Sequence, residues 1–255
     1  MQRVTENNTK YDMKKNNFFI ALCAIALGFS ACSSDDDEQP QQLFVSPTTI
    51  EAVDLGLPSG IKWCNMNVGA KDAQSYGEYF AWGDSTLRGD NWATDYKYNW
   101  TKASFNNGQN TFNQTFFNKN KDRFCPYGTL ASKYDAATQI YGDEWRMPTE
   151  SEWQELYDNC TWEWTDNYNS NSNVAGYIVY KDNKDNHIFL PAAGKRNSGS
   201  LSEVGQGFYW SSTLPDSKKP WYASSMYFRK DFIKWDNPYQ HYYGFQIRAV
   251  QDKNK

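Results

Sequence analysis

The segment that most constrains this chain is 145–153, which reads Trp-Arg-Met-Pro-Thr-Glu-Ser-Glu-Trp. Thr149 followed three residues later by Glu152 is the pattern of a capping box, in which each residue satisfies the other's free backbone amide at a helix start. Glutamates in the first turns also stabilise the helix, because their negative charge lies near the positive end of the helix dipole. Apolar residues then recur at helical spacing, namely Trp153, Leu156, Tyr157 and Cys160. The sequence predicts a short helix that docks by one face.

The residues before this helix predict an extended entry. Trp145 and Met147 flank Arg146 with strand-like alternation, and Pro148 disfavours helix for the residue before it. Arg146 and the glutamates would suit an acid/base or ligand site. A capped helix with an internal ion pair explains the same residues, and we favour that structural interpretation.

Residues 1–31 are predicted to be a targeting segment and not part of the fold. Met13 is the expected start, which leaves residues 1–12 as an upstream extension, although Met1 stays an alternative. The apolar run from Phe18 to Phe29 is too short to span a bilayer, which needs ~20 residues, and is typical of a signal peptide. Residues 29–32 resemble a lipobox, which implies lipidation at Cys32.

Residues 32–42 form an acidic, polar stretch that we expect to be a lipidated tether. Its acidic run resembles the surface-export signal of Bacteroidetes lipoproteins, which implies an outer-membrane protein facing the exterior and anchored by its lipid. From Cys32 onward the chain has 22 Lys and Arg against 28 Asp and Glu, a net charge of −6. An acidic chain is a poor nucleic-acid binder, so we expect no nucleic-acid partner.

The ordered domain is predicted to occupy residues 43–255. We expect an irregular loop region over 87–127 and a hairpin whose Asp/Asn-rich residues 182–186 form a turn, although such a loop could also bind calcium. The further expected elements are a hairpin around Pro58-Ser59-Gly60, a short strand in 76–84, a helix over 130–141, strands flanking 182–186 at 176–181 and 187–191, a strand at 223–228 and a last strand at 243–250.

Six segments in order resemble the Fibrobacter succinogenes major paralogous domain, a relative of formylglycine-generating-enzyme-like domains and of the C-type lectin fold. They are residues 53–70, 76–84, 145–153, 188–194, 207–213 and 244–250. The resemblance implies an α+β fold of C-type-lectin-like architecture, with antiparallel sheets, two helices and long irregular loops. The chain departs from the family at Met66, where cysteine is common, and at Ala249, where proline is usual.

Cysteine and histidine usage argues against an enzyme. Cys64, Cys125 and Cys160 cannot all pair within one chain, so at least one is a free buried or an intermolecular thiol, and their spacing fits no zinc site. The related formylglycine-generating enzymes use a cysteine pair late in the fold, but no cysteine follows Cys160. His187 and His241 lie in no nucleophile motif. We therefore expect no catalytic residue, metal or cofactor, while a glycosidase carboxylate pair stays open.

The favoured function is ligand binding, with a glycan as the expected ligand. C-type-lectin-like domains bind ligands on loops ahead of their last strands, and this chain carries aromatic and polar residues there, namely Trp221, Trp235, Asp236, Asn237 and Tyr239. Aromatic faces beside Asp and Asn suit sugars. Trp235 and Tyr242 could instead be core residues of a hairpin.

Two further points bear on the ligand and on the last strand. Calcium-lectin triplets such as Glu-Pro-Asn are absent, which argues against calcium dependence. A protein–protein adhesin or an envelope assembly subunit is the alternative function. Arg248 is expected to make a partly buried ion pair or to stack on an aromatic ring.

Overall fold

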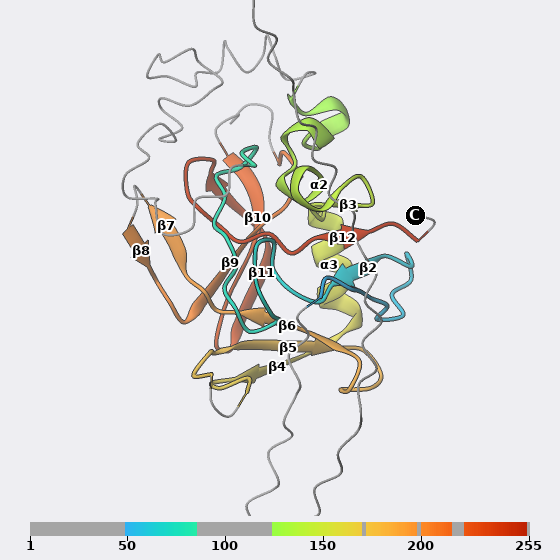
Figure 1. Ribbon diagram of the computed structural model, residues 1–255, viewed down its shortest axis with the longest axis vertical. Helices are drawn as coiled ribbons and strands as arrows, with labels where there is room; N and C mark the ends of the chain where they lie inside the picture. Colours follow the sequence, from blue (N-terminus) through green and yellow to red (C-terminus); the bar gives the residue numbers. More distant parts are fainter. Residues whose placement is uncertain (1–48, 86–123, 170–171, 198–199, 216–221, 254–255) are drawn as a thin grey trace, which may run out of the picture. The chain divides into compact units, whose positions relative to one another are not determined.

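The computed structural model describes residues 49–85, 124–169, 172–197, 200–215 and 222–253 (Figure 1). Within these residues the fold is mostly antiparallel sheet with two α-helices, in agreement with the expected α+β class. The predicted signal peptide, Cys32, the tether and Trp221 lie outside the described residues. So does the expected loop region 87–127, except for its last four residues.

A four-stranded antiparallel sheet joins the two ends of the described chain. Its order is β1 (Ala52–Val53), β2 (Lys62–Cys64), β12 (Val250–Gln251) and β3 (Trp145–Arg146). The predicted hairpin around Pro58 is confirmed: the Gly60 amide donates to the Leu57 carbonyl at 2.9 Å. Gly60 has φ +74°, a conformation that glycine adopts without a steric penalty.

The central sheet has the order β11 (Phe232–Gln240), β10 (Tyr222–Arg229) and β9 (Gln206–Trp210). The strand predicted at 223–228 is confirmed, but residues 223–226 are all buried in succession. The reason is that both faces of this sheet are covered. Phe208 and Trp210 pack in one core with Phe245, while Tyr209 and Phe228 pack in a second core with the helix α3.

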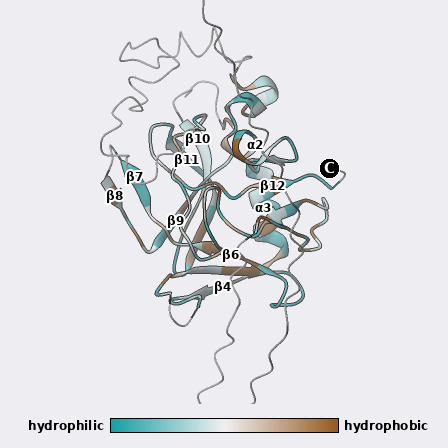
Figure 2. Ribbon diagram, viewed as in Figure 1, coloured by the Kyte–Doolittle hydropathy of each residue, from teal (hydrophilic) through white to brown (hydrophobic). Residues whose placement is uncertain are grey.

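A second three-stranded sheet consists of β4 (Thr161–Thr165), β5 (Gly176–Tyr180) and β6 (His187–Pro191). Its β5–β6 hairpin is among the most hydrophobic parts of the ribbon in Figure 2. The predicted turn at 182–186 is confirmed, because the Asn183 side chain accepts from the Asp185 amide at 2.9 Å. A separate small hairpin consists of β7 (Lys195–Asn197) and β8 (Ser200–Ser202).

The two helices differ in how well their bounds were predicted. α3 (Glu150–Asn159) begins at the predicted cap, Thr149, with both halves of the capping box formed. α2 (Ala136–Tyr141) begins later than the predicted helix over 130–141, because Asp135 caps it and a separate 3-10 turn, Ser132–Tyr134, precedes it. A further 3-10 turn spans Pro126–Gly128.

Two predicted strands are largely wrong. In 76–84 only Phe80 makes a bridge, and in 243–250 regular pairing starts only at Val250. The cause is that residues 244–246 each bridge a different part of the chain: Gly244 to Arg196, Phe245 to Phe80 and Gln246 to Tyr209. The segment therefore makes isolated bridges and has no continuous partner strand until Val250.

The three domain cysteines are free thiols, and Cys64 and Cys125 are buried, so the prediction of a free buried thiol is confirmed. Burial raises the pKa of Cys125 to about 12. Among the residues described, no helix has the length and apolar character needed to cross a membrane.

Candidate functional site

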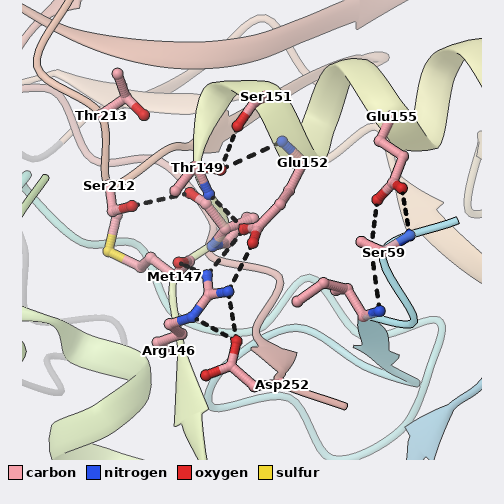
Figure 3. Close-up of polar contacts among 12 residues, drawn as sticks. Ser59, Arg146, Met147, Thr149, Ser151, Glu152, Glu155, Ser212, Thr213 and Asp252 are labelled. Carbon is pink, nitrogen blue, oxygen red and sulfur yellow. Dashed lines mark hydrogen bonds and ion pairs between the residues drawn. The ribbon is translucent and has the colours of Figure 1, made fainter. Parts of the chain in front are cut away.

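The junction between β3 and α3 is held by an ion-pair network (Figure 3). Arg146 donates to both carboxylate oxygens of Glu152, at 2.8 and 2.6 Å, and its Nη2 donates to Asp252 at 2.7 Å. Burial opposes the charge on Arg146, but the hydrogen bonds with Glu152 and Asp252 outweigh it and hold the pKa above its usual range. The predicted internal ion pair is confirmed, and these contacts fit the structural interpretation of the motif.

The other glutamates of α3 also bind protein groups. Glu155 accepts from the Ser59 amide at 2.8 Å and from its hydroxyl at 2.6 Å, which ties the helix to the first hairpin (Figure 3). Glu150 accepts from the Ser224 hydroxyl at 2.5 Å. Sequence reasoning assigned these glutamates to the helix dipole and missed their partners, which lie 96 and 74 residues away in the chain.

Asp135 connects α2 to the same junction. Its Oδ1 accepts from the Ala137 and Thr138 amides, and its Oδ2 accepts from the Met147 amide at 2.8 Å. Burial raises the pKa of this carboxyl to about 6, although the three amide donors act in the opposite direction. The arrangement is a helix cap that also fixes the chain before Pro148.

Arg248 is fully buried, so the expectation of a partly buried ion pair or aromatic stacking is wrong. Its guanidinium donates twice to the Asn67 side-chain oxygen, at 2.9 and 2.7 Å. It also donates to the carbonyls of Cys64 at 3.0 Å and Phe189 at 2.6 Å. Burial lowers the pKa of Arg248. Because every one of these acceptors is uncharged, the arginine acts as a hydrogen-bonding hub between β2, the following loop and β6.

The candidate ligand residues of β11 are divided by a β-bulge. Tyr227 pairs with Lys234 and Ser225 pairs with Asn237, so one residue of β10 faces two residues of β11, Trp235 and Asp236. An extra residue reverses the side-chain alternation beyond it. Trp235 consequently packs toward the core that contains α3, while Tyr239 packs toward the opposite core. The predicted set is not one surface.

On the α3 side, three rings form what we call the aromatic platform: Tyr157, Trp162 and Trp235. The rings of Tyr157 and Trp235 lie 4.7 Å apart with 31° between their planes, and Trp162 lies 6.2 Å from Tyr157. Tyr157 is 36% exposed, and the two tryptophans are half-buried. Sequence reasoning assigned Tyr157 to the buried helix face and did not single out Trp162. Only the helical spacing of Tyr157 marked it at all.

The residues that flank Trp235 in the chain are polar. Asp236 follows Trp235 and lies 3.7 Å from the Lys234 ammonium, with both side chains about half exposed. Asn237 is only half-buried, and its carbonyl accepts from the Ser225 hydroxyl at 2.7 Å. A carboxylate and an ammonium therefore flank Trp235 in the chain.

On the opposite face, Tyr239 belongs to a cluster around a buried lysine. The Lys195 ammonium bonds the Tyr239 hydroxyl, pairs with Glu203 at 2.7 Å and lies 4.8 Å from the Phe208 ring centre. Burial opposes its charge, but Glu203 and Tyr239 outweigh this and raise its pKa. Tyr239 thus already binds a cation from its own chain, and its predicted role as a sugar platform is less well supported than that of Trp235.

The two histidines lie in packed surroundings. His241 stacks on Trp82 with ring centres 4.4 Å apart, and burial lowers its pKa to about 3. His187 Nε2 lies 2.8 Å from the Tyr168 hydroxyl. In the part of the chain that the structure describes, no group of three or more His, Cys, Asp or Glu side chains is placed to hold a metal ion.

Comparisons with protein-family models, with curated proteins and with solved structures give no match to this chain.

Proposed function

We propose that this chain is a non-catalytic glycan-binding module, held on the outer face of the outer membrane by a lipid on Cys32. The lipobox-like residues 29–32 and the acidic tether after them support the anchor. A C-type-lectin-like architecture is part of the proposal. Antiparallel sheets with two helices and the six family-like segments support it.

The observation that carries the proposal is the aromatic platform. Sugars present C–H faces that stack on aromatic rings, while their hydroxyls exchange hydrogen bonds with groups such as carboxylates. Tyr157 and Trp235 supply partly exposed rings at 4.7 Å from each other, and Asp236 lies next to Trp235 in sequence. We therefore assign the ligand to the Trp235 face of β11 and not to the Tyr239 face.

A glycan array with the full chain purified in detergent tests this function. Trp235→Ala and Tyr157→Ala should each weaken retention by about tenfold or more, the equivalent of ~1.4 kcal/mol. Tyr239→Ala, which removes the ring on the opposite face, is the matched control and should retain the glycan. A chelator should leave retention unchanged.

The outcomes separate the candidate functions. Retention lost in Tyr239→Ala but kept in Trp235→Ala would place the ligand on the other face. A correctly folded protein that retains no glycan would refute the glycan proposal. It would favour the alternative of an adhesin or an envelope assembly subunit, which crosslinking on intact cells would then test.

A further inference from the structure

The β4–β5–β6 sheet has two edges. The alternation of bonded and non-bonded residue pairs along its strands shows which backbone groups face each edge. The Ala192 amide donates to the Ala175 carbonyl at 2.8 Å, and in an antiparallel ladder every second residue pair bonds in this way. Residues 188 and 190 of β6 therefore face β5, while the carbonyls of Phe189 and Pro191 face outward. Both are capped, by Arg248 at 2.6 Å and by the Tyr209 hydroxyl at 2.8 Å. The β6 edge is closed.

The same alternation determines which backbone groups lie at the other edge, along β4. Residues 176, 178 and 180 of β5 face β4, where their register partners are Thr165, Glu163 and Thr161. The backbone N–H and C=O groups of Trp162 and Trp164 consequently point away from β5. No residue within the described ranges bonds these four groups. The β4 edge therefore offers a short row of free donors and acceptors.

This open edge differs from β11, an edge strand of the central sheet. Edge strands are commonly protected by proline, lysine or a bulge, because any of these hinders pairing with another chain. β11 carries Pro238, Lys234 and the bulge at Trp235 and Asp236. β4 has the sequence Thr-Trp-Glu-Trp-Thr and none of these devices. Its residues are β-branched or aromatic apart from Glu163, and such residues favour strands.

We infer that β4 is a self-association edge, and that two copies of this chain pair antiparallel through it about a two-fold axis at Glu163. The five residues read the same in both directions, so Trp162 of one copy lies opposite Trp164 of the other. The outward groups of these residues then form four backbone hydrogen bonds. An isologous contact of this kind closes as a dimer and does not grow further.

The charges at the axis fit a symmetric contact. Glu163 lies on the sheet face opposite the tryptophans, and its carboxylate pairs with Lys184 at 2.7 Å. Two copies would bring two carboxylates and two ammonium groups to the axis, so the group is neutral overall. Like charges directly opposite each other remain unfavourable, which predicts a weak dimer that strengthens when Glu163 is neutralised.

Disulfide trapping tests the pairing in the full chain, on intact cells and after purification in detergent. Glu163→Cys in a Cys160→Ser background should form a covalent dimer, because residues facing each other across the axis come close enough for a disulfide. Asp236→Cys in the same background is the control on β11 and should stay monomeric. No covalent dimer from Glu163→Cys, or equal yields from the two variants, overturns the inference.

Charge and backbone variants provide an independent measurement by sedimentation velocity. Glu163→Gln should lower the dimer dissociation constant by up to about fivefold, and Glu163→Lys should raise it. Trp164→Pro removes an outward amide and should abolish the dimer, while the β4–β5 ladder does not use that amide. If Trp164→Pro does not fold, the opposite effects of the two Glu163 variants on the dissociation constant still test pairing through β4. Equal effects of these two, or a monomer at every concentration, would rule out pairing through β4.

Discussion

Replacing Arg248 by methionine should remove a large part of the domain's stability. Methionine has a similar length and no polar hydrogen-bond donor, so it leaves the Asn67 side-chain oxygen and the carbonyls of Cys64 and Phe189 without their donor. All three residues are buried, as is Arg248 itself. The change therefore creates unsatisfied acceptors inside the protein and does not simply delete a surface charge.

The magnitude follows from the number of acceptors. Each buried polar group left without a partner costs roughly 1–3 kcal/mol, so three acceptors together represent about 3–9 kcal/mol. Removing a desolvated guanidinium recovers part of this cost, in keeping with the lowered pKa of Arg248. We expect a net loss of at least ~2 kcal/mol, against a total of ~5–15 kcal/mol for a typical domain.

Urea unfolding followed by tryptophan fluorescence measures the effect. Arg229→Met is the matched control, since Arg229 is exposed at the end of β10 and should change the free energy of unfolding by less than ~1 kcal/mol. If Arg248→Met unfolds at the same urea concentration as the wild type, the acceptors are satisfied in some other way and the hub argument is refuted.

Three further predictions concern Asp135, the capping box and a glycine in the central sheet. The pKa of Asp135 is about 6 in the folded state against 3.8 ordinarily, so the folded state binds more protons between these values. Its contribution to stability should therefore fall by about 3 kcal/mol as pH rises from below 4 to above 6, and Asp135→Asn should remove this slope from urea unfolding curves. Thr149→Ala should lower the free energy of unfolding by about 1 kcal/mol through the lost cap. Ser151→Ala, at an exposed position two residues further on, should be nearly neutral in thermal unfolding. Gly207→Ala should cost ~1–3 kcal/mol, because a Cβ at Gly207 would overlap the Phe228 ring, and an unchanged melting temperature would contradict that packing.

The parts of this fold that could be predicted from sequence are those whose partners are close in the chain. The capping box lies within 3 residues, and the turn at Asn183 bonds an amide only 2 residues away. Asp135 could have been identified as a helix cap by the same logic, but the apolar spacing from Leu130 onward favoured an earlier start. A cap residue therefore marks a helix start from short-range sequence, whereas apolar spacing alone misplaced the start of α2.

The parts that could not be predicted depend on distant partners. Arg146 gains Asp252, which is 106 residues away, and Arg248 gains Asn67, which is 181 residues away. The segment 243–250 has strand-like composition, yet residues 244–246 bridge three separate parts of the chain and have no continuous partner strand. No periodicity in the segment itself distinguishes these two situations.

The candidate site illustrates the same limit most sharply. Trp235 and Tyr239 are four residues apart, and in a regular strand that spacing would put both rings on one face. The bulge opposite Met226 adds one residue, so the two rings face different cores, and the ring nearest to Trp235 comes from α3. The bulge is a property of the pairing between β10 and β11 and is invisible in either strand alone. A binding surface on this sheet therefore has to be assigned from the register, and the register favours Tyr157 and Trp162 as the companions of Trp235.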